Sequence, residues 1–321
     1  MTSLILPSDA TDLDPPPGLE ALARRATGLA ENARATNTRR AYKSDWRDFA
    51  GWCAARERDP LPAAPALVGL YLAAREHLSV ATLSRRVSSI AAEHRRTGHS
   101  LDTRHPAIAD VLRGLRRERG SAQRHAEALT VPLLKRVLAH MGDDLGALRD
   151  RALLLVGIVA ALRRSELVAL DVADIAVGEE GLRITIRQSK TDAEGHGAVL
   201  AVGRTRRPTC PAAAYEAWLA AARITKGAAF RAVDRHGRLG GRLSGNAVAL
   251  IVQRRAAAAG LDPAVYSGHS LRSGFATTAA RAGMGEFKIA AQTRHASLAV
   301  LRRYVREGRL FEENLSDEIG L

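Results

Sequence analysis

Apolar residues recur at helical spacing in nearly every segment of this chain, and a single region alternates as a β-strand does. Between Tyr42 and Cys53, for example, apolar side chains fall at i, i+4, i+7 and i+11, the period of one buried helix face. In residues 182–187, by contrast, leucine and isoleucine alternate with arginine and threonine, the period of a half-exposed strand. The pattern predicts a mainly α fold with a small antiparallel β-sheet.

The length of 321 residues exceeds what one hydrophobic core usually covers, and it favours two domains. We predict an all-helical domain over 19–120 and a mostly α domain that contains the sheet over 130–321. The stretch at 121–129 loses its apolar period and collects small and charged residues, which is typical of a linker. Residues 1–18 are rich in proline and acidic side chains and indicate a flexible tail.

The second domain has the clearest element signals. Helices are predicted near residues 131–141, 146–162, 211–224, 244–260 and 269–283. The strand at 182–188 has a partner at 196–203, and the turn composition between them puts Lys190 at or near a hairpin tip. From about residue 308 apolar residues again follow near-helical spacing, over a length too short for a core of its own. This predicts a C-terminal tail helix.

The charge of the chain indicates a polyanionic partner. Lys and Arg number 48 against 34 Asp and Glu, a net charge of +14 that is spread along the chain. Nucleic acid is the leading candidate. An acidic membrane surface is the competitor, but it usually requires a basic amphipathic anchor or a lipidation signal, and the sequence contains neither.

The first domain carries much of this charge. Residues 36–125 hold 17 Lys or Arg against 9 Asp or Glu. In the helix near 83–96 we expect an inward stripe and an outward face, formed respectively by Leu83, Val87, Ile90, His94 and by Arg85, Arg86, Ser89, Arg96. The candidate DNA contacts are Arg39, Arg40, Lys43, Arg85, Arg86 and Arg96. An ordinary solvated surface is the alternative interpretation, because exposed arginines are common.

Several classes of protein are disfavoured. Two cysteines, Cys53 and Cys210, cannot form a disulfide framework, and no CxxC or HExxH spacing organises the ten histidines into a metal site. The longest apolar run, 152–162, is about half the length needed to span a bilayer. The N-terminus lacks a signal-peptide pattern, so we expect a cytoplasmic, nucleoid-associated protein.

Four stretches of the second domain contain polar residues that packing does not need: "ALRRSEL", the predicted hairpin tip, "HSLRSGF" and "RHASLAVLRRY". The candidate catalytic residues in them are Arg163, Glu166, Lys190, His269, Arg272, His295 and Tyr304. Each has a structural interpretation when taken alone. An arginine near a glutamate is often a surface ion pair, and Tyr304 lies at helical spacing from apolar neighbours, as a core aromatic would.

The order and spacing of these stretches resemble the tyrosine recombinases, the group that includes lambda integrase and the Xer proteins. The motifs that carry the resemblance are an arginine with a glutamate three residues later, a hairpin lysine, "HSLR", and a histidine nine residues before a tyrosine. The stretches "AFRAVDRHGRLGGRLSGNAVALIV" and "HSLRSGFATTAARAG" look closer to the Cre-like branch. The resemblance implies an N-terminal core-binding domain of SAM-like fold before a C-terminal catalytic domain.

Two positions depart from the pattern of this family. Many members have a glycine directly before the second histidine or its tryptophan equivalent, whereas Arg294 precedes His295 here. The family's usual Thr-Gly-Leu-Arg is Ala160-Ala161-Leu162-Arg163 in this chain, a change that removes no chemical group.

The residue types suit transfer of a DNA phosphodiester, which requires charge neutralisation and delivery of a proton to a poor leaving group. Arg163 and Arg272 fit bidentate contact with the non-bridging oxygens. Lys190 on a loop fits protonation of the leaving 5′ oxygen. Tyr304 fits the nucleophile, which would become a 3′-phosphotyrosine.

The remaining residues would support these roles. We expect His269 to accept the tyrosine proton or bind the phosphate, and His295 to donate to a non-bridging oxygen. Glu166 is expected to orient Arg163 or His269. The covalent link would conserve the phosphodiester energy, so no metal, ATP or other cofactor is expected.

For a recombinase, the resemblance implies a homotetramer on two specific DNA sites that exchanges strands through a Holliday junction. In relatives the tail helix inserts into a neighbouring subunit; a tail folded back on its own domain is the alternative. Two other functions remain open. One is DNA relaxation by a type IB topoisomerase, which acts as a monomer, and the other is non-catalytic DNA-binding regulation on the same scaffold.

Overall fold

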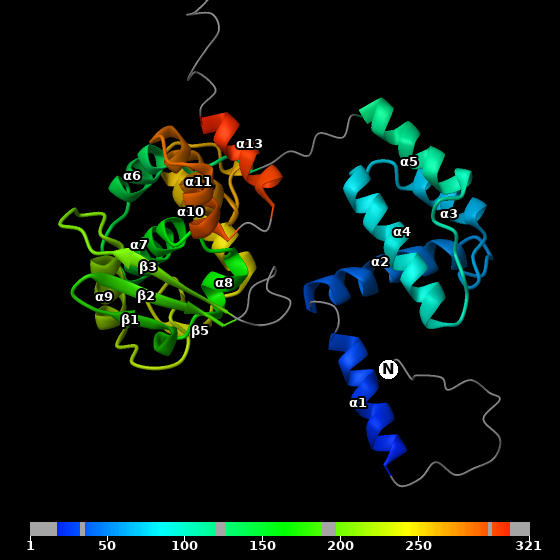
Figure 1. Ribbon diagram of the computed structural model, residues 1–321, viewed down its shortest axis with the longest axis horizontal. Coiled ribbons are helices and arrows are strands. Elements are labelled where there is room, and N and C mark those ends of the chain that lie inside the picture. Colours follow the sequence, from blue (N-terminus) through cyan, green and yellow to red (C-terminus); the bar gives the residue numbers. More distant parts are fainter. Residues whose placement is uncertain (1–17, 33–35, 120–125, 188–196, 295–296, 309–321) are drawn as a thin grey trace, which may run out of the picture. The chain divides into compact units, whose positions relative to one another are not determined.

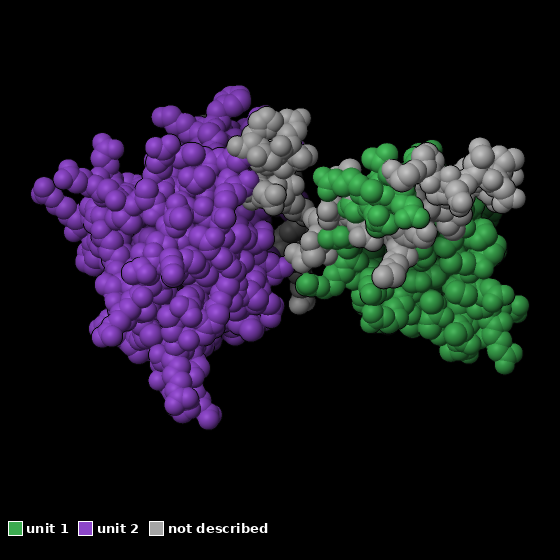
Figure 2. Space-filling model, turned by 90° about the horizontal axis from the view of Figure 1, so that it is seen from below, with its two compact units in different colours: residues 1–124 green, residues 125–321 purple. Residues whose placement is uncertain are grey.

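The computed structural model describes residues 18–32, 36–119, 126–187, 197–294 and 297–308 (Figure 1). The chain divides into two compact units, residues 1–124 and 125–321, which Figure 2 colours separately. The predicted flexible tail, Lys190, His295 and the predicted tail helix beyond residue 308 lie outside the described residues.

The described part of the first unit is helical throughout. Its helices are α1 (Leu19–Asn32), α2 (Thr36–Ala54), α3 (Pro65–Ala74), α4 (Val80–Arg96) and α5 (Pro106–Arg119). The predicted inward stripes of α2 and α4 form its core, in which Phe49, Cys53, Leu83 and Ile90 are fully buried. His94 also lies inside, because its Nε2 accepts from the Ala63 backbone N–H at 2.8 Å.

The outward face predicted for α4 is wrong at two positions. Ser89 is 2% exposed, and its hydroxyl donates to the Tyr42 carbonyl at 2.8 Å. The Arg86 side chain is 13% exposed and donates to Asp48 at 2.8 Å. The reason is that α2 presents two aspartates, Asp45 and Asp48, toward α4, and these carboxylates hold the arginines between the helices.

The second unit is mostly helical and contains two small sheets. Its helices are α6 (Val131–Ala139), α7 (Leu145–Val159), α8 (Arg164–Ala169), α9 (Pro211–Ala222), α10 (Gly245–Ala258), α11 (Ser270–Arg281), α12 (Glu286–Thr293) and α13 (Leu298–Gly308), with short 3-10 turns at Val172–Asp174 and Pro263–Val265. The buried helix α7 packs against α9 and α11 at the centre of the unit. The mainly α fold with small antiparallel sheets is confirmed.

The predicted hairpin forms part of a three-stranded sheet. Strands β1 (Ile175–Val177), β2 (Gly181–Ile186) and β3 (Ala198–Gly203) pair antiparallel in the order β1-β2-β3. In the β2–β3 pair Ile184 lies opposite Leu200, and both are buried. A second pair, β4 (Arg231–Val233) and β5 (Leu239–Arg242), was not predicted.

The end of the predicted linker belongs to the second unit. The Glu127 N–H donates to the Val265 carbonyl at 2.7 Å, and the Leu129 N–H donates to Ser270 at 2.9 Å. Gly274 permits this approach, since a Cβ at that position would lie 2.1 Å from the Leu129 carbonyl oxygen. Glu127 is therefore bound to the 3-10 turn at Pro263–Val265, and Leu129 lies directly against α11.

No helix in the described ranges has the length and apolar character that crossing a membrane requires.

Candidate active site

The turn that follows α7 places Arg163 at the N-cap of α8. Glu166, three residues later, accepts from the Arg163 backbone N–H at 2.9 Å and from the Arg163 guanidinium at 2.7 Å. The backbone reaches this turn through Ala161, which has φ +47°, a left-handed conformation that glycine adopts without strain. The predicted contact between Arg163 and Glu166 is thus formed, and it is largely buried.

The start of α11 brings two further site residues to the same region. His269 is the N-cap of this helix, and Arg272 lies in its first turn, where the helix dipole favours an anion. Arg272 is 2% exposed, and its Nη1 donates to the Ala161 carbonyl at 2.8 Å. Its Nη2 is buried and has no hydrogen-bond partner within the described part of the chain.

Tyr304 lies on α13, which packs beside α11 (Figure 1). The residue is 8% exposed, and it packs in a small apolar cluster with Ile289, Leu301 and Val305. Its hydroxyl lies 2.8 Å from His269 Nε2, at hydrogen-bond distance. The ring therefore packs as a core aromatic does, while the hydroxyl points to the candidate catalytic residues.

Arg294 is a member of this cluster that sequence reasoning did not include. Its guanidinium donates to Glu166 Oε2 at 2.6 Å, so the carboxylate lies between the guanidiniums of Arg163 and Arg294. The available signal was a charged residue at a position where a helix usually ends in glycine. That signal identifies an unusual residue but does not say where its side chain goes.

The pKa values reflect this concentration of positive charge. Burial, reinforced by the neighbouring charges of Arg163 and Arg294, lowers the pKa of Arg272 to about 10, which leaves it charged at neutral pH. Burial acts to raise the pKa of the Glu166 carboxyl, but the Arg163 backbone N–H and the charges of Arg294 and Arg163 outweigh it. The pKa of Glu166 therefore lies below its ordinary value, and Glu166 is ionised.

The structure thus brings together five of the seven predicted catalytic residues, namely Arg163, Glu166, His269, Arg272 and Tyr304. Lys190 and His295 fall outside the described residues. In the sequence, Lys190 lies between β2 and β3, and His295 follows the end of α12.

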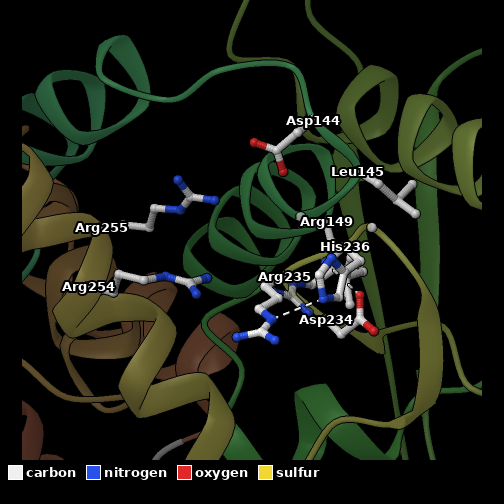
Figure 3. A pocket seen from close by; sticks show the side chains of 11 residues that line it. Asp144, Leu145, Arg149, Asp234, Arg235, His236, Arg254 and Arg255 are labelled. Atoms are coloured by element: carbon white, nitrogen blue, oxygen red, sulfur yellow. Dashed lines mark hydrogen bonds between the residues drawn. The ribbon is translucent and has the colours of Figure 1, made fainter.

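A cavity of about 650 Å³ lies elsewhere in this unit (Figure 3). It is lined by Asp144 and Arg149 at the start of α7, by the β4–β5 turn, and by Arg254 and Arg255 of α10. The catalytic candidates gather at the turn after the other end of α7, a helix of 15 residues that is about 22 Å long. The cavity is therefore separate from the candidate site.

Comparison with known proteins identifies the class to which this fold belongs. The structure resembles that of a lambda integrase dimer bound to a COC′ core site, with a TM-score of 0.53 and 16% identity, and the alignment covers 89% of this chain and 94% of the lambda integrase chain.

 A second structure, the Tn1549 transposon integrase in complex with transposon right end DNA, has a TM-score of 0.57 and 15% identity, and covers 84% of this chain and 89% of that chain. Both share the mostly helical fold with small antiparallel sheets.

The sequence comparisons give the family. Residues 127–309, more than half of the chain, match the phage integrase family. The chain is 36% identical over 304 residues to the integrase/recombinase xerD homolog of Selenomonas ruminantium, an alignment that covers 92% of this chain and 89% of the relative. The chain belongs to the phage integrase family, the tyrosine recombinases. The predicted family is confirmed, while the finer placement in the Cre-like branch stays a prediction.

Proposed function

We propose that the protein is a site-specific DNA recombinase that cleaves and rejoins strands through a 3′-phosphotyrosine intermediate. The observation that carries the proposal is the 2.8 Å approach of the Tyr304 hydroxyl to His269 Nε2, in the same cluster as the buried Arg272 guanidinium. A nucleophile, a proton acceptor and a cation for the phosphate are the parts that this reaction needs.

Cleavage would form a bond between the Tyr304 oxygen and phosphorus and break the bond from phosphorus to the 5′ oxygen. His269 would take the phenolic proton. Arg272 supports the role of phosphate ligand because its buried Nη2 has no hydrogen-bond partner among the described residues. A buried cation with an unused donor gains most from an anionic ligand.

Arg163 would bind the same phosphate from the other side, held by Glu166. Lys190 is proposed to protonate the leaving 5′ oxygen, and His295 to donate to a non-bridging oxygen. The 5′ hydroxyl of another strand would later attack the phosphotyrosine and restore the phosphodiester. Bond energy is conserved in this exchange, so we propose that it proceeds without metal or ATP.

The partner would be double-stranded DNA with a specific recombination site. The lambda and Tn1549 integrases are named as complexes with DNA, and the Selenomonas relative is named as an integrase/recombinase. We further propose a homotetramer on two sites, a Holliday junction between the two strand exchanges, and docking of the tail helix on a neighbouring subunit. Type IB topoisomerase activity would use the same chemistry on one site.

The test is the formation of a covalent adduct with fragments of the genomic DNA next to the gene for this protein, followed on denaturing gels. Wild-type protein should become linked to DNA, whereas Tyr304→Phe should form no adduct and keep its DNA affinity, because dispersed phosphate contacts supply the binding. Strand cleavage by Tyr304→Phe at the wild-type rate would end the proposal. Supercoil relaxation by a monomer, with no exchange between two sites, would favour the topoisomerase.

A further inference from the structure

Arg294 has a backbone conformation that is unfavourable for a residue with a side chain. It ends α12 with φ 53° and ψ 47°, in the left-handed region where residues with a side chain are disfavoured and glycine is common. Arg223 ends α9 in nearly the same conformation, with φ 51° and ψ 42°, but its side chain is exposed. The Arg294 side chain is only 12% exposed, so the two arginines share a backbone shape and differ in what they contact.

The two terminal nitrogens of the Arg294 guanidinium donate to groups within the protein. Nη1 donates to the carbonyls of Ala160 and Gln292 at 3.3 and 3.0 Å. Nη2 donates to Glu166 at 2.6 Å and to the Ala161 carbonyl at 3.5 Å. Both terminal nitrogens of Arg294 are therefore engaged, whereas the Nη2 of Arg272 has no partner among the described residues. The Nε of Arg294 is buried and likewise has no partner there. Because both terminal nitrogens donate to the protein, Arg294 fits a structural role better than a phosphate contact.

Its contacts instead converge on Arg163. Glu166 receives Arg294 on one carboxylate oxygen and Arg163 on the other. The Arg294 carbonyl also accepts from Arg163 Nη2 at 3.4 Å. In addition, Ala160 and Ala161 belong to the turn that leads into Arg163. One residue thus fixes the carboxylate, the turn and the guanidinium itself.

We propose that Arg294 is a positioning residue that holds Arg163, through Glu166 and the 160–161 turn, in the orientation for DNA cleavage. This inference rests on the proposed function. A group displaced by about 1 Å from its productive position can lose about a hundredfold in rate. An arginine at this position thus orders the site before DNA arrives, at the expense of a strained backbone.

The experiment compares Arg294→Gly with Arg223→Gly as the matched control. Both changes put glycine at a position with a left-handed backbone and so remove the strain of a side chain there. Only Arg294→Gly also removes a contact to Glu166. We expect Arg294→Gly to slow single-turnover adduct formation by about ten- to a hundredfold at unchanged DNA affinity. Arg223→Gly should cleave at the wild-type rate and raise the thermal midpoint by roughly 2 to 4 °C.

A double-mutant comparison separates positioning from a general loss of structure. If Arg294 acts through Glu166, Arg294→Gly should slow cleavage much less in a Glu166→Gln background than in the wild type. If Arg294→Gly does not fold, Arg294→Lys is the variant that tests the proposal. Lysine lacks the forked donors of arginine, so this variant should cleave DNA more slowly than wild type at equal DNA affinity. A wild-type rate for the folded variant overturns the proposal.

The two proposals fail differently. If wild-type protein forms an adduct and Arg294→Gly forms it equally fast, only the role of Arg294 is refuted. If DNA-bound wild-type protein forms no adduct, the proposed function fails, and the role of Arg294 fails with it.

Discussion

The guanidinium of Arg272 is the most deeply buried cation in the candidate site. It is almost fully buried beside two other arginines, and one described carboxylate, Glu166, partly offsets them. Burying like charges together is unfavourable unless something else gains from it. A site prepared for an anion accounts for this arrangement, since the phosphate would supply the missing negative charge.

Glu166 should make the stability of the protein depend on pH. Its pKa is lowered in the folded state, so its contribution is present above the ordinary value of 4.5 and is lost as the pH falls through the folded pKa. Glu166→Gln should lower the free energy of unfolding by about 2 to 3 kcal/mol at pH 7. Urea unfolding at several pH values checks this, because the difference should shrink below pH 4.5. A difference that is constant down to acid pH would contradict it.

For individual residues, the sequence predicted most members of the candidate site and the contact between Arg163 and Glu166, but not every other contact. Arg163 with Glu166 follows from helical spacing, which places residues i and i+3 together. The approach of His269 to Tyr304 spans 35 residues, and only the motif order indicated it. Arg294 was missed because the path of a side chain from a left-handed residue depends on the turn at 160–161, far away in sequence.

The helix α11 is the element on which the site depends, because it carries His269 and Arg272 and contacts α7 and α13. Gly274 in its middle lies against the backbone of Leu129. Glycine is unfavourable inside a helix by about 1 kcal/mol relative to alanine. The close approach of residues 127–129 explains why glycine is present here.

Gly274→Ala should therefore destabilise the protein despite the better helix propensity of alanine. The added methyl would overlap the Leu129 carbonyl oxygen at 2.1 Å, and overpacking of this kind costs about 1 to 3 kcal/mol. Thermal unfolding measures the effect. The control is Gly114→Ala on α5, where an added Cβ would have no atom within 4 Å. Gly283, just after α11, also has open space, but its φ of +72° would strain an alanine. An unchanged midpoint for Gly274→Ala would contradict the packing argument.

Long elements were predictable and short ones were not. The predicted helix at 244–260 corresponds to α10, whose N-cap Ser244 accepts from the Ala247 N–H at 3.1 Å, as its sequence indicates. Strands β1 and β4 have three residues each, too few for an alternating pattern to be distinguished. Their pairing depends on tertiary contacts that periodicity does not describe.

At the scale of the whole molecule, the net charge of +14 describes the attraction to DNA but not which side chains supply it. In the first unit, Arg85, Arg86 and Arg96 are paired with Asp45, Asp48 and Glu93. Arg40 and Lys43 on α2 are exposed and have no ion-pair partner among the described residues. Composition counts all of these cations equally, so it could not predict this division.

We expect Lys43→Gln to weaken DNA binding and to reduce the slope of log affinity against log salt concentration by about 1, as loss of one phosphate contact requires. Arg86→Gln is the contrasting variant. Because Arg86 is held by α2, its loss should lower the unfolding midpoint and leave the salt slope unchanged. Binding titrations at several salt concentrations distinguish them. Equal slopes for Lys43→Gln and wild type would remove Lys43 from the interface.

The most direct measurement of the central claim identifies the residue that carries DNA. The trapped adduct is digested with a protease, and the peptide linked to nucleotide is sequenced by mass spectrometry. We predict a single linkage, from the Tyr304 oxygen to a 3′ phosphate, with a free 5′ hydroxyl on the released strand. Linkage to another residue, or to a 5′ phosphate, would contradict the account.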